Sequence, residues 1–455
     1  MDLKDKNVLI VGLGKTGEAA AGFLLARGAR VTITDMKTET ELGPKAALWR
    51  ERGAVLETGG HTIETFLASD LIIPSPGVPL VPAFREAVER GVPVLSEIEL
   101  AFRFLKGKVI AVTGTNGKST TTTLLHEILK GAGLKAYLAG NIGTPLLSFV
   151  ERSRESHVYA TEVSSFQLEY IETFRAATAA LLNLAPNHLD RHPTFESYIA
   201  AKKKIVTAQK TGDAAILNRD DARVWALRGD VSSDVLAFSR KRPVRRGAFV
   251  RDGWIVLRDG GERRVMPAAE VKLPGLHNLE NVLAAVLAAD REGVPVPEIR
   301  AAVKKFRGLE HRLERVLTLR GVEFVNDSKA TTVDAALKAM AGFDRPLVLI
   351  LGGKDKGADF APLRRAVRSK VKKVILVGAA KDKIRKALAG AVPMEDARTF
   401  PDVVPLAFAA ASRGDVVLLA PACTSWDMFR NFEERGRAFK RAARRLARTF
   451  QGRRG

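Results

Sequence analysis

The chain has 455 residues, of which 46% are hydrophobic and 27% are charged, so a disordered protein and a single small domain are excluded and three domains are expected. Its one cysteine, Cys423, cannot form an intrachain disulfide. We find no signal-peptide pattern and no apolar run of about 18 residues, and therefore expect a cytoplasmic protein without a transmembrane segment.

Three times along the chain, a short apolar run precedes a glycine-rich or small polar turn, which is the pattern of parallel α/β units. Between residues 248 and 266, short alternating runs separated by Asp-Gly pairs predict a small antiparallel element. The predicted fold class is therefore α/β, with three domains. We place them at residues 1–106, 107–308 and 309–455.

The first turn, GLGKTG at residues 12–17, lies between an expected strand and an expected helix. With Asp35 at the end of the next strand, it fits a loop that binds a dinucleotide diphosphate. An NAD-dependent oxidoreductase would show the same pattern, so this class of enzyme stays open.

The second turn, TGTNGKST, has the composition of a phosphate-binding loop, although Val112 replaces the first glycine of the usual G-x-x-x-x-G-K pattern. Its backbone N–H groups and the following helix are expected to face an anion. Lys118 would reach terminal phosphate oxygens, and Ser119 or Thr120 a Mg²⁺ ion. The expected strand, loop and helix cover residues 109–113, 114–120 and 121–130.

This loop resembles the ATP loop of the Mur ligases and the related folylpolyglutamate synthetases. Further segments resemble that family in the expected order along nearly the whole chain. They are YATEV at 159–163, NLAPNH at 183–188, YIAAK at 198–202, GLHNLEN at 275–281, GLEHRLE at 308–314 and NDSKATT at 326–332. The resemblance implies a Rossmann-like UDP-binding domain, a central P-loop ATPase-like domain with a parallel sheet, and a C-terminal Rossmann-like domain.

The resemblance also implies the reaction: ATP-dependent ligation of D-glutamate to UDP-N-acetylmuramoyl-L-alanine through an acyl phosphate, in peptidoglycan synthesis. The cofactors would be ATP and two Mg²⁺ ions, and a monomer is expected. A related ligase of this fold that adds a different amino acid is the alternative. The chain lacks the D-N-P-R motif of the diamino-acid-adding relatives, which favours glutamate.

Residue by residue, the resemblance implies an ATP site and a metal site. The ATP positions are Gly114, Thr115, Asn116, Gly117, Lys118, Ser119, Thr120, Asn278, Asn281, Arg312, Asp327 and Lys329. The metal positions are Ser119, Glu162, His188 and carbamylated Lys202, and the catalytic residues would be Lys118, Glu162, His188 and Lys202. The adjacent Lys203 leaves the register of the carbamylated lysine open by one position. Asn278 and Asn281 equally fit helix N-cap residues.

The resemblance implies two further substrate sites. The UDP-substrate positions are Lys15, Thr16, Asp35, Met36, Lys37, Gly77, Asn141 and His188. The D-glutamate positions are Thr331, Lys356, Ser425 and Phe432. Among these, Lys356 is a natural partner for a carboxylate.

The last residues of the chain are strongly basic. From Arg437 onward, including Lys440, this tail contains no acid, and the net charge of the chain is +22. Phe439, Leu446 and Phe450 fit one apolar stripe of a terminal helix. The basic residues would form a solvated helix face or contact a membrane surface or polyanion. A nucleic-acid-binding ATPase stays an alternative, but we see no helicase or RNA-binding motifs and expect no nucleic-acid partner.

Overall fold

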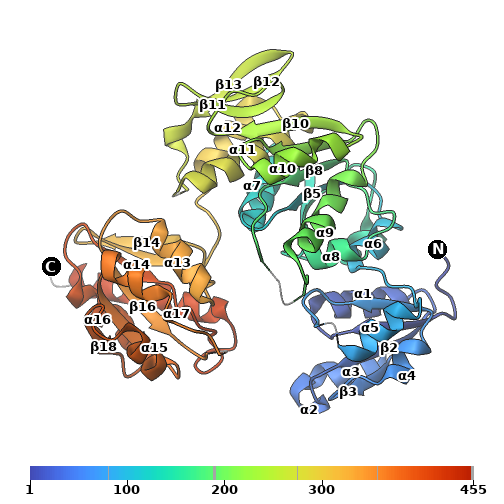
Figure 1. The fold of residues 1–455 in the computed structure, drawn as a ribbon, viewed down its shortest axis with the longest axis horizontal. Helices are drawn as coiled ribbons and strands as arrows, with labels where there is room; N and C mark the ends of the chain where they lie inside the picture. The colour runs from blue at the N-terminus through green and yellow to red at the C-terminus, as the bar shows by residue number, and fades with distance from the viewer. Residues whose placement is uncertain (80, 188–190, 274, 356, 452–455) are drawn as a thin grey trace. The chain divides into compact units, whose positions relative to one another are not determined.

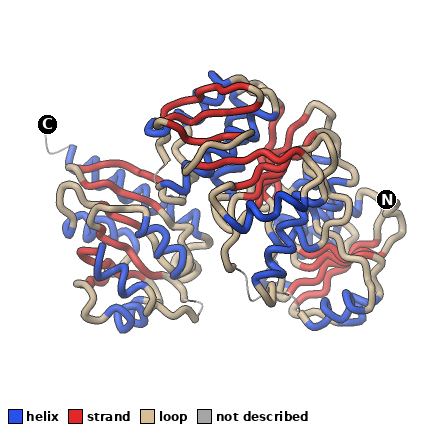
Figure 2. The backbone as a smooth tube through the Cα atoms, turned by 45° about the horizontal axis from the view of Figure 1, so that its top comes forward, coloured by secondary structure: helices blue, strands red, loops and turns tan. Residues whose placement is uncertain are grey.

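The computed structural model describes residues 1–79, 81–187, 191–273, 275–355 and 357–451. Their strands form three sheets, with helices packed on the sheet faces (Figure 2). The chain divides into two compact units, residues 1–272 with 276–306, and residues 273–275 with 307–455. None of the helices within the described ranges has the length and apolar composition needed to span a membrane. The α/β class with parallel sheets is thus confirmed.

The first sheet, in the blue part of the chain in Figure 1, is parallel, with the strand order β3-β2-β1-β4. Its strands are β1 (Asn7–Val11), β2 (Arg30–Asp35), β3 (Val55–Thr58) and β4 (Leu71–Pro74). Its helices are α1 (Lys15–Leu25), α2 (Glu39–Leu42), α3 (Pro44–Glu51), α4 (Ile63–Leu67), α5 (Pro82–Glu89) and α6 (Glu97–Phe102). Because all four strands run in parallel, the loops after β1, β2 and β4 meet at one edge.

The second sheet has the strand order β13-β12-β11-β10-β9-β8-β5-β7-β6. Its strands are β5 (Lys108–Thr113), β6 (Lys135–Gly140), β7 (His157–Glu162), β8 (Thr178–Leu181), β9 (Ala214–Asn218), β10 (Asp234–Ser239), β11 (Gly247–Arg251), β12 (Trp254–Asp259) and β13 (Gly261–Pro267). Neighbours from β6 to β11 pair in parallel, whereas β12 and β13 pair antiparallel. Asp252 and Gly253 turn the chain with positive φ angles of 50° and 74°, which confirms the predicted antiparallel element.

The helical segments of this second region cover both faces of its sheet. They are α7 (Lys118–Gly131), η1 (Leu146–Arg152), α8 (Ser165–Glu169), α9 (Phe195–Thr207), α10 (Ala222–Ala226), η2 (Leu227–Asp230), η3 (Ala268–Glu270), α11 (Leu276–Arg291) and α12 (Val296–Lys305). One continuous apolar cluster joins residues of the first sheet, such as Ile10, to residues of the second, such as Ala111. These two sheets therefore share a core within the first compact unit.

The third sheet has the order β14-β15-β19-β16-β17-β18, and only its β14–β15 pair is antiparallel. Its strands are β14 (Glu314–Leu319), β15 (Val322–Asn326), β16 (Leu347–Gly352), β17 (Val371–Val377), β18 (Met394–Asp396) and β19 (Val416–Leu419). Its helices are α13 (Val333–Ala341), α14 (Leu363–Lys370), α15 (Lys381–Leu388), η4 (Phe400–Asp402), α16 (Val403–Ala410) and α17 (Phe432–Gln451). Separate apolar clusters cover the two faces of this sheet.

The described part of the basic tail, residues 437–451, belongs to α17, whose apolar stripe packs on this third sheet. Phe439 is fully buried, and the ring of Phe450 lies 5.4 Å from that of Phe408. Lys440 departs from the expected solvated face, because its ammonium group bonds the carboxylates of Glu310 and Glu314 at 2.6 and 2.8 Å. One cation of the tail is therefore largely covered and paired with two carboxylates.

Glu99 in α6 links the part of the chain that forms the first sheet to the part that forms the second sheet. One carboxylate oxygen accepts hydrogen bonds from the backbone N–H groups of Glu172, Thr173 and Phe174 at 2.9, 2.9 and 2.7 Å. The other accepts from Oγ1 of Thr173 at 2.6 Å and from Nε of Arg103 at 2.8 Å. Burial opposes ionisation, but these hydrogen bonds outweigh it and lower the pKa of Glu99.

Replacing Glu99 with alanine is expected to destabilise the first unit by about 3 kcal/mol, because three backbone N–H groups and Arg103 lose a fully buried carboxylate acceptor. Urea unfolding measures the effect, with exposed Glu89→Ala as the matched control. The lowered pKa means that the contribution of Glu99 is present above the ordinary carboxyl pKa and is lost as the pH falls through the folded pKa. An unfolding midpoint equal to that of the control would contradict this role.

Candidate functional site

The predicted phosphate loop joins β5 to α7 at the carboxyl end of a central strand. Gly114 and Gly117 have positive φ angles of 147° and 86°. A Cβ at residue 117 would lie 2.1 Å from Oδ1 of Asn281, so only glycine fits there. The helix begins at Lys118, three residues before its predicted start, because Gly117 in the left-handed conformation already ends the loop. Lys118, Ser119 and Thr120 thus form its first turn, where backbone N–H groups favour an anion.

The side chain of Lys118 folds back over the loop. Its Nζ donates to the carbonyl oxygens of Gly114 and Thr115 at 2.9 and 3.0 Å. The loop therefore holds a positive charge beside a helix N-terminus, and both features attract phosphate.

Asn278 and Asn281 lie inside α11, so the interpretation as N-cap residues is wrong. Asn281 contacts the loop at Gly117, and its Nδ2 donates to Oδ1 of Asn278 at 3.0 Å. The helix register turns both amides inward, since both residues are buried. The structure thus brings these two predicted nucleotide residues to the phosphate loop.

Glu162 ends β7, beside the loop that follows β6. One of its carboxylate oxygens accepts from Nδ2 of Asn141 at 2.6 Å. Its other oxygen is buried and has no hydrogen-bond partner among the described residues. A buried carboxylate oxygen that has no hydrogen-bond partner among the described residues is a suitable ligand for a hard cation such as Mg²⁺.

Lys202 of α9 is 1% exposed, and its Nζ donates to Oγ1 of Thr113 at 3.1 Å. Burial, together with repulsion from Lys118, lowers the pKa of Lys202 well below its ordinary value, against the attraction of Glu162. Lys203 instead pairs with Asp230 at 3.0 Å, and its side chain is 34% exposed. Of the two lysines left open by the sequence, Lys202 is the one beside the phosphate loop.

Two residues that sequence reasoning did not select shape this loop. Asn183 accepts from the backbone N–H of Asn116 at 2.8 Å and donates back to its carbonyl oxygen at 3.0 Å. Thr113 accepts from Lys202 and donates to the carbonyl oxygen of Val163 at 2.8 Å. Their positions at or just after strand ends next to the loop were the available signal.

The predicted UDP-substrate residues of the first sheet lie at or shortly after the carboxyl ends of β1, β2 and β4. Asp35 uses both carboxylate oxygens to accept from the backbone N–H groups of Leu13 and Lys37, at 2.7 and 2.9 Å. Lys15 and Thr16 open α1, Met36 is 61% exposed, and Gly77 turns the chain after β4 with a φ of 86°. Asp35 therefore organises the two loops that carry most of this set.

In the second unit, the residues predicted for ATP lie on two adjoining loops. The backbone N–H of Leu313, next to Arg312, donates to Oδ1 of Asp327 at 3.1 Å. The N–H of Lys329 donates to the carbonyl oxygen of His311 at 3.1 Å. Burial raises the pKa of Asp327 to about 6, against the hydrogen bond from Leu313. The structure thus brings Arg312, Asp327 and Lys329 into one region.

Buried Arg435 in α17 joins this region to the segment predicted for D-glutamate, and the sequence did not single it out. Its guanidinium donates to Oγ and the carbonyl oxygen of Ser328 at 2.9 and 2.8 Å, and to the carbonyl oxygens of Cys423 and Thr424 at 3.0 and 3.1 Å. Burial lowers the pKa of Arg435 to about 10. Ser425, which is predicted to contact D-glutamate, is the next residue after Thr424 and is also buried.

Two further D-glutamate positions, Thr331 and Phe432, lie close to Ser328 and Lys329. The backbone N–H of Thr331 donates to the carbonyl oxygen of Lys329 at 2.8 Å. Phe432 opens α17, its carbonyl oxygen accepts from Oγ of Ser328 at 2.8 Å, and its ring lies 5.8 Å from Nζ of Lys329. Thr331 and Phe432 are therefore neighbours of the residues predicted for ATP.

Comparison with known proteins agrees with this arrangement. Three family models match in chain order: the MurD-like N-terminal domain at residues 6–96, the Mur ligase middle domain at 112–289, and the Mur ligase glutamate ligase domain at 311–423. The UDP-N-acetylmuramoylalanine–D-glutamate ligase of Koribacter versatilis is 48% identical over 98% of this chain and 99% of its own. The chain belongs to the Mur ligase family. The enzyme of the same name from Acidobacterium capsulatum is 50% identical over 97% of this Mur ligase and 96% of its own chain.

Solved structures show the same fold at low sequence identity. A pseudomurein peptide ligase type C from Methanothermus fervidus is 17% identical with a TM-score of 0.58, covering 97% of this chain and 100% of its own. The UDP-N-acetylmuramate–alanine ligase of Thermotoga maritima is 18% identical, with the same TM-score and coverage. Family membership favours a ligase over the oxidoreductase and the nucleic-acid-binding ATPase.

Two residues predicted for this Mur ligase lie outside the described residues. They are His188, expected at the metal and the UDP substrate, and Lys356, expected at D-glutamate. Their roles stay predictions.

Proposed function

We propose that this Mur ligase joins D-glutamate to UDP-N-acetylmuramoyl-L-alanine, with conversion of ATP to ADP and phosphate. The observation that carries the proposal is the group formed by Lys118, Glu162 and Lys202 at the phosphate loop. The two full-length relatives named above, which are called ligases of this kind, support the choice of substrates. The enzyme acts in the cytoplasm as a monomer.

The chemistry requires that a carboxylate be made reactive at neutral pH. The alanyl carboxylate attacks the γ-phosphorus of ATP, the bond from that phosphorus to the β–γ bridging oxygen breaks, and an acyl phosphate and ADP result. The amine of D-glutamate then attacks the acyl carbon, loses a proton, and expels inorganic phosphate to leave an amide. Both anionic reactants of the first step must be brought together against their repulsion.

Residues at the phosphate loop can reduce this repulsion between the two anionic reactants. The Lys118 ammonium neutralises phosphate charge, and the N–H groups of Ser119 and Thr120 at the start of α7 orient the phosphates. Ser119, Glu162 and carbamylated Lys202, together with His188, would hold two Mg²⁺ ions. Bound Mg²⁺ supplies charge neutralisation and orientation of the phosphate oxygens.

The other predicted residues supply the substrate contacts. Asn278, Asn281, Arg312, Asp327 and Lys329 bind the nucleotide. The UDP substrate is held by Lys15, Thr16, Asp35, Met36, Lys37, Gly77 and Asn141, with His188. D-Glutamate is held by Thr331, Lys356, Ser425 and Phe432.

Phosphate release from ATP tests the function, measured with UDP-N-acetylmuramoyl-L-alanine in the presence and absence of D-glutamate. We expect one phosphate for each amide formed, and release that depends on D-glutamate. L-Glutamate, L-lysine and diaminopimelate serve as matched amino acids. Preference for one of these would replace the proposal by the related ligase of different specificity.

A further inference from the structure

Arg312, proposed above to contact ATP, lies in a turn with an unusual backbone. The residues on either side, His311 and Leu313, have positive φ angles of 65° and 43°. Residues other than glycine rarely adopt this left-handed region, and they persist there only where surrounding contacts hold them. The direction of the Arg312 side chain therefore depends on what holds this turn.

Glu314 and Asp327 hold the turn from two sides. Oε2 of Glu314 accepts from the backbone N–H of His311 at 2.9 Å, and Oδ1 of Asp327 accepts from that of Leu313 at 3.1 Å. Both strained residues thus donate their N–H groups to a carboxylate. The position of the Glu314 carboxylate consequently helps to set the backbone around Arg312.

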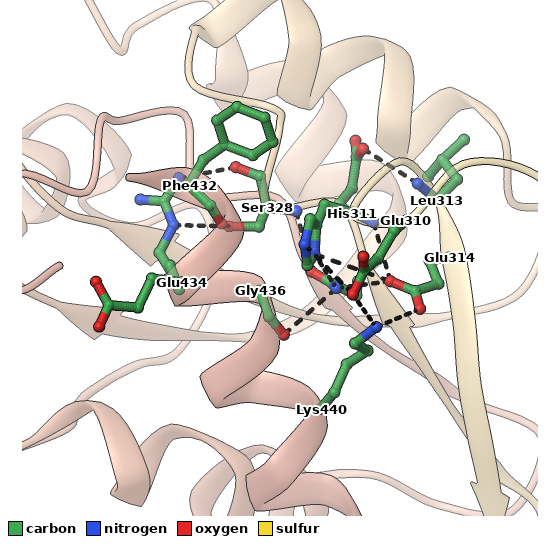
Figure 3. A network of polar contacts seen from close by, with 12 residues as sticks. Glu310, His311, Leu313, Glu314, Ser328, Phe432, Glu434, Gly436 and Lys440 are labelled. Carbon is green, nitrogen blue, oxygen red and sulfur yellow. Dashed lines mark hydrogen bonds and ion pairs between the residues drawn. The ribbon is translucent and has the colours of Figure 1, made fainter. Parts of the chain in front are cut away.

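Helix α17 fixes that carboxylate through Lys440, as Figure 3 shows. The Lys440 ammonium donates to Glu314 at 2.8 Å and to Glu310 at 2.6 Å, and the lysine side chain is only 12% exposed. Ligand atoms of Glu310, His311 and Glu314 lie within 4.8 Å of one another, as in a metal site. Here the ammonium of Lys440 supplies the positive charge between the two carboxylates.

Asn326 and Gly436 allow the close contact between α17 and the turn at Arg312. The Oδ1 of Asn326 accepts from the N–H of Ser328 at 3.2 Å, which orients the amide so that its Nδ2 donates to Nδ1 of His311 at 3.0 Å and to Glu314 at 2.9 Å. A Cβ at residue 436 would lie 2.2 Å from Nδ1 of His311. The helix approaches the turn this closely because glycine stands at that position.

We propose that Lys440 is a positioning residue that holds the Arg312 turn in the conformation that binds ATP phosphates, an inference that rests on the proposed function. Without the ammonium group, the carboxylates of Glu310 and Glu314 repel each other, and the strained turn loses part of its support. Arg312 then has to be ordered when ATP binds, which weakens binding. One residue of the basic tail thereby acquires a role in nucleotide binding.

The experiment measures the dissociation constant of ATP by calorimetry on the full chain. Lys440→Met is expected to weaken binding about tenfold, and Lys440→Arg to restore most of it. Arg441→Met is the matched control, because Arg441 is an exposed neighbour on the same helix. This control is expected to bind ATP as the wild type does.

A double-mutant cycle separates positioning from general destabilisation. In an Arg312→Ala background, Lys440→Met is expected to change ATP affinity less than about twofold, because its effect passes through Arg312. Unchanged affinity of Lys440→Met in the wild-type background, an equal loss in both backgrounds, or an equal loss in the Arg441→Met control overturns the proposal.

A second variant keeps the test decisive if Lys440→Met fails to fold. Glu314→Gln retains an oxygen for the N–H of His311 but loses the ion pair through which Lys440 fixes this side chain, so weaker ATP binding that depends on Arg312 is expected here as well, although no repulsion between carboxylates arises. ATP binding does not depend on which amino acid is ligated. Absence of D-glutamate ligation with this pattern intact would therefore contradict the proposed function alone.

Discussion

Replacing Lys118 with alanine is expected to lower the rate of D-glutamate ligation about a thousandfold, because the phosphate loop loses the charge that neutralises the transferred phosphate. The Lys118 ammonium already lies over this loop, bonded to the carbonyl oxygens of Gly114 and Thr115. Phosphate release under saturating substrates measures the effect. Normal ligation by the purified variant would remove the basis of the proposed mechanism.

Lys130→Ala is the matched control for this change. Lys130 is an exposed lysine in the last turn of the same helix, α7, far from the loop. The control is expected to retain wild-type activity. Binding of the UDP substrate is expected to survive in both variants, because its proposed contacts lie mainly in the loops of the first sheet.

The strand ends of the site could be predicted from the sequence because they follow from local patterns. An apolar run followed by TGTNGKST places a loop at the end of β5, and Glu162 ends the apolar run of β7. Since parallel strands present their carboxyl ends at one edge, the meeting of Glu162 and the loop follows from the topology. Short or edge strands such as β3 and β18 cannot be predicted in this way, since they lack a buried apolar run.

Contacts between segments far apart in the sequence could not be predicted from local sequence patterns. The bonds of Asn183 to Asn116, and the contact of Asn281 with Gly117, join residues far apart in the sequence. Arg435 could not be identified from the sequence, because the pattern of a basic helix does not distinguish a buried arginine from its solvated neighbours. Hydrophobic periodicity gives the face of a helix but does not identify the backbone oxygens that lie against it.

Lys202 is expected to be required for ligation, and its pKa gives the reason. Because burial and the charge of Lys118 lower this pKa well below its ordinary value, a larger share of this amine than of an ordinary lysine is uncharged near neutral pH, and the uncharged nitrogen can attack CO₂. A proton then leaves the nitrogen, and the product is an anionic carbamate suited to Mg²⁺. As the pH falls through the pKa of Lys202 in the folded protein, the amine is protonated and can no longer form the carbamate. The contribution of the uncharged lysine to stability is lost over the same range of pH.

We therefore expect Lys202→Ala to lower activity about a hundredfold or more, whereas Lys203→Ala, on the partly exposed side of α9, changes it little. With ¹³C-bicarbonate, a carbamate resonance is expected for the wild type and for Lys203→Ala but not for Lys202→Ala. Loss of that resonance in Lys203→Ala alone would move the modified lysine by one position. A wild-type protein without the resonance would leave Lys202 as a buried, unmodified lysine, and the metal site would then depend on Glu162 and its remaining partners.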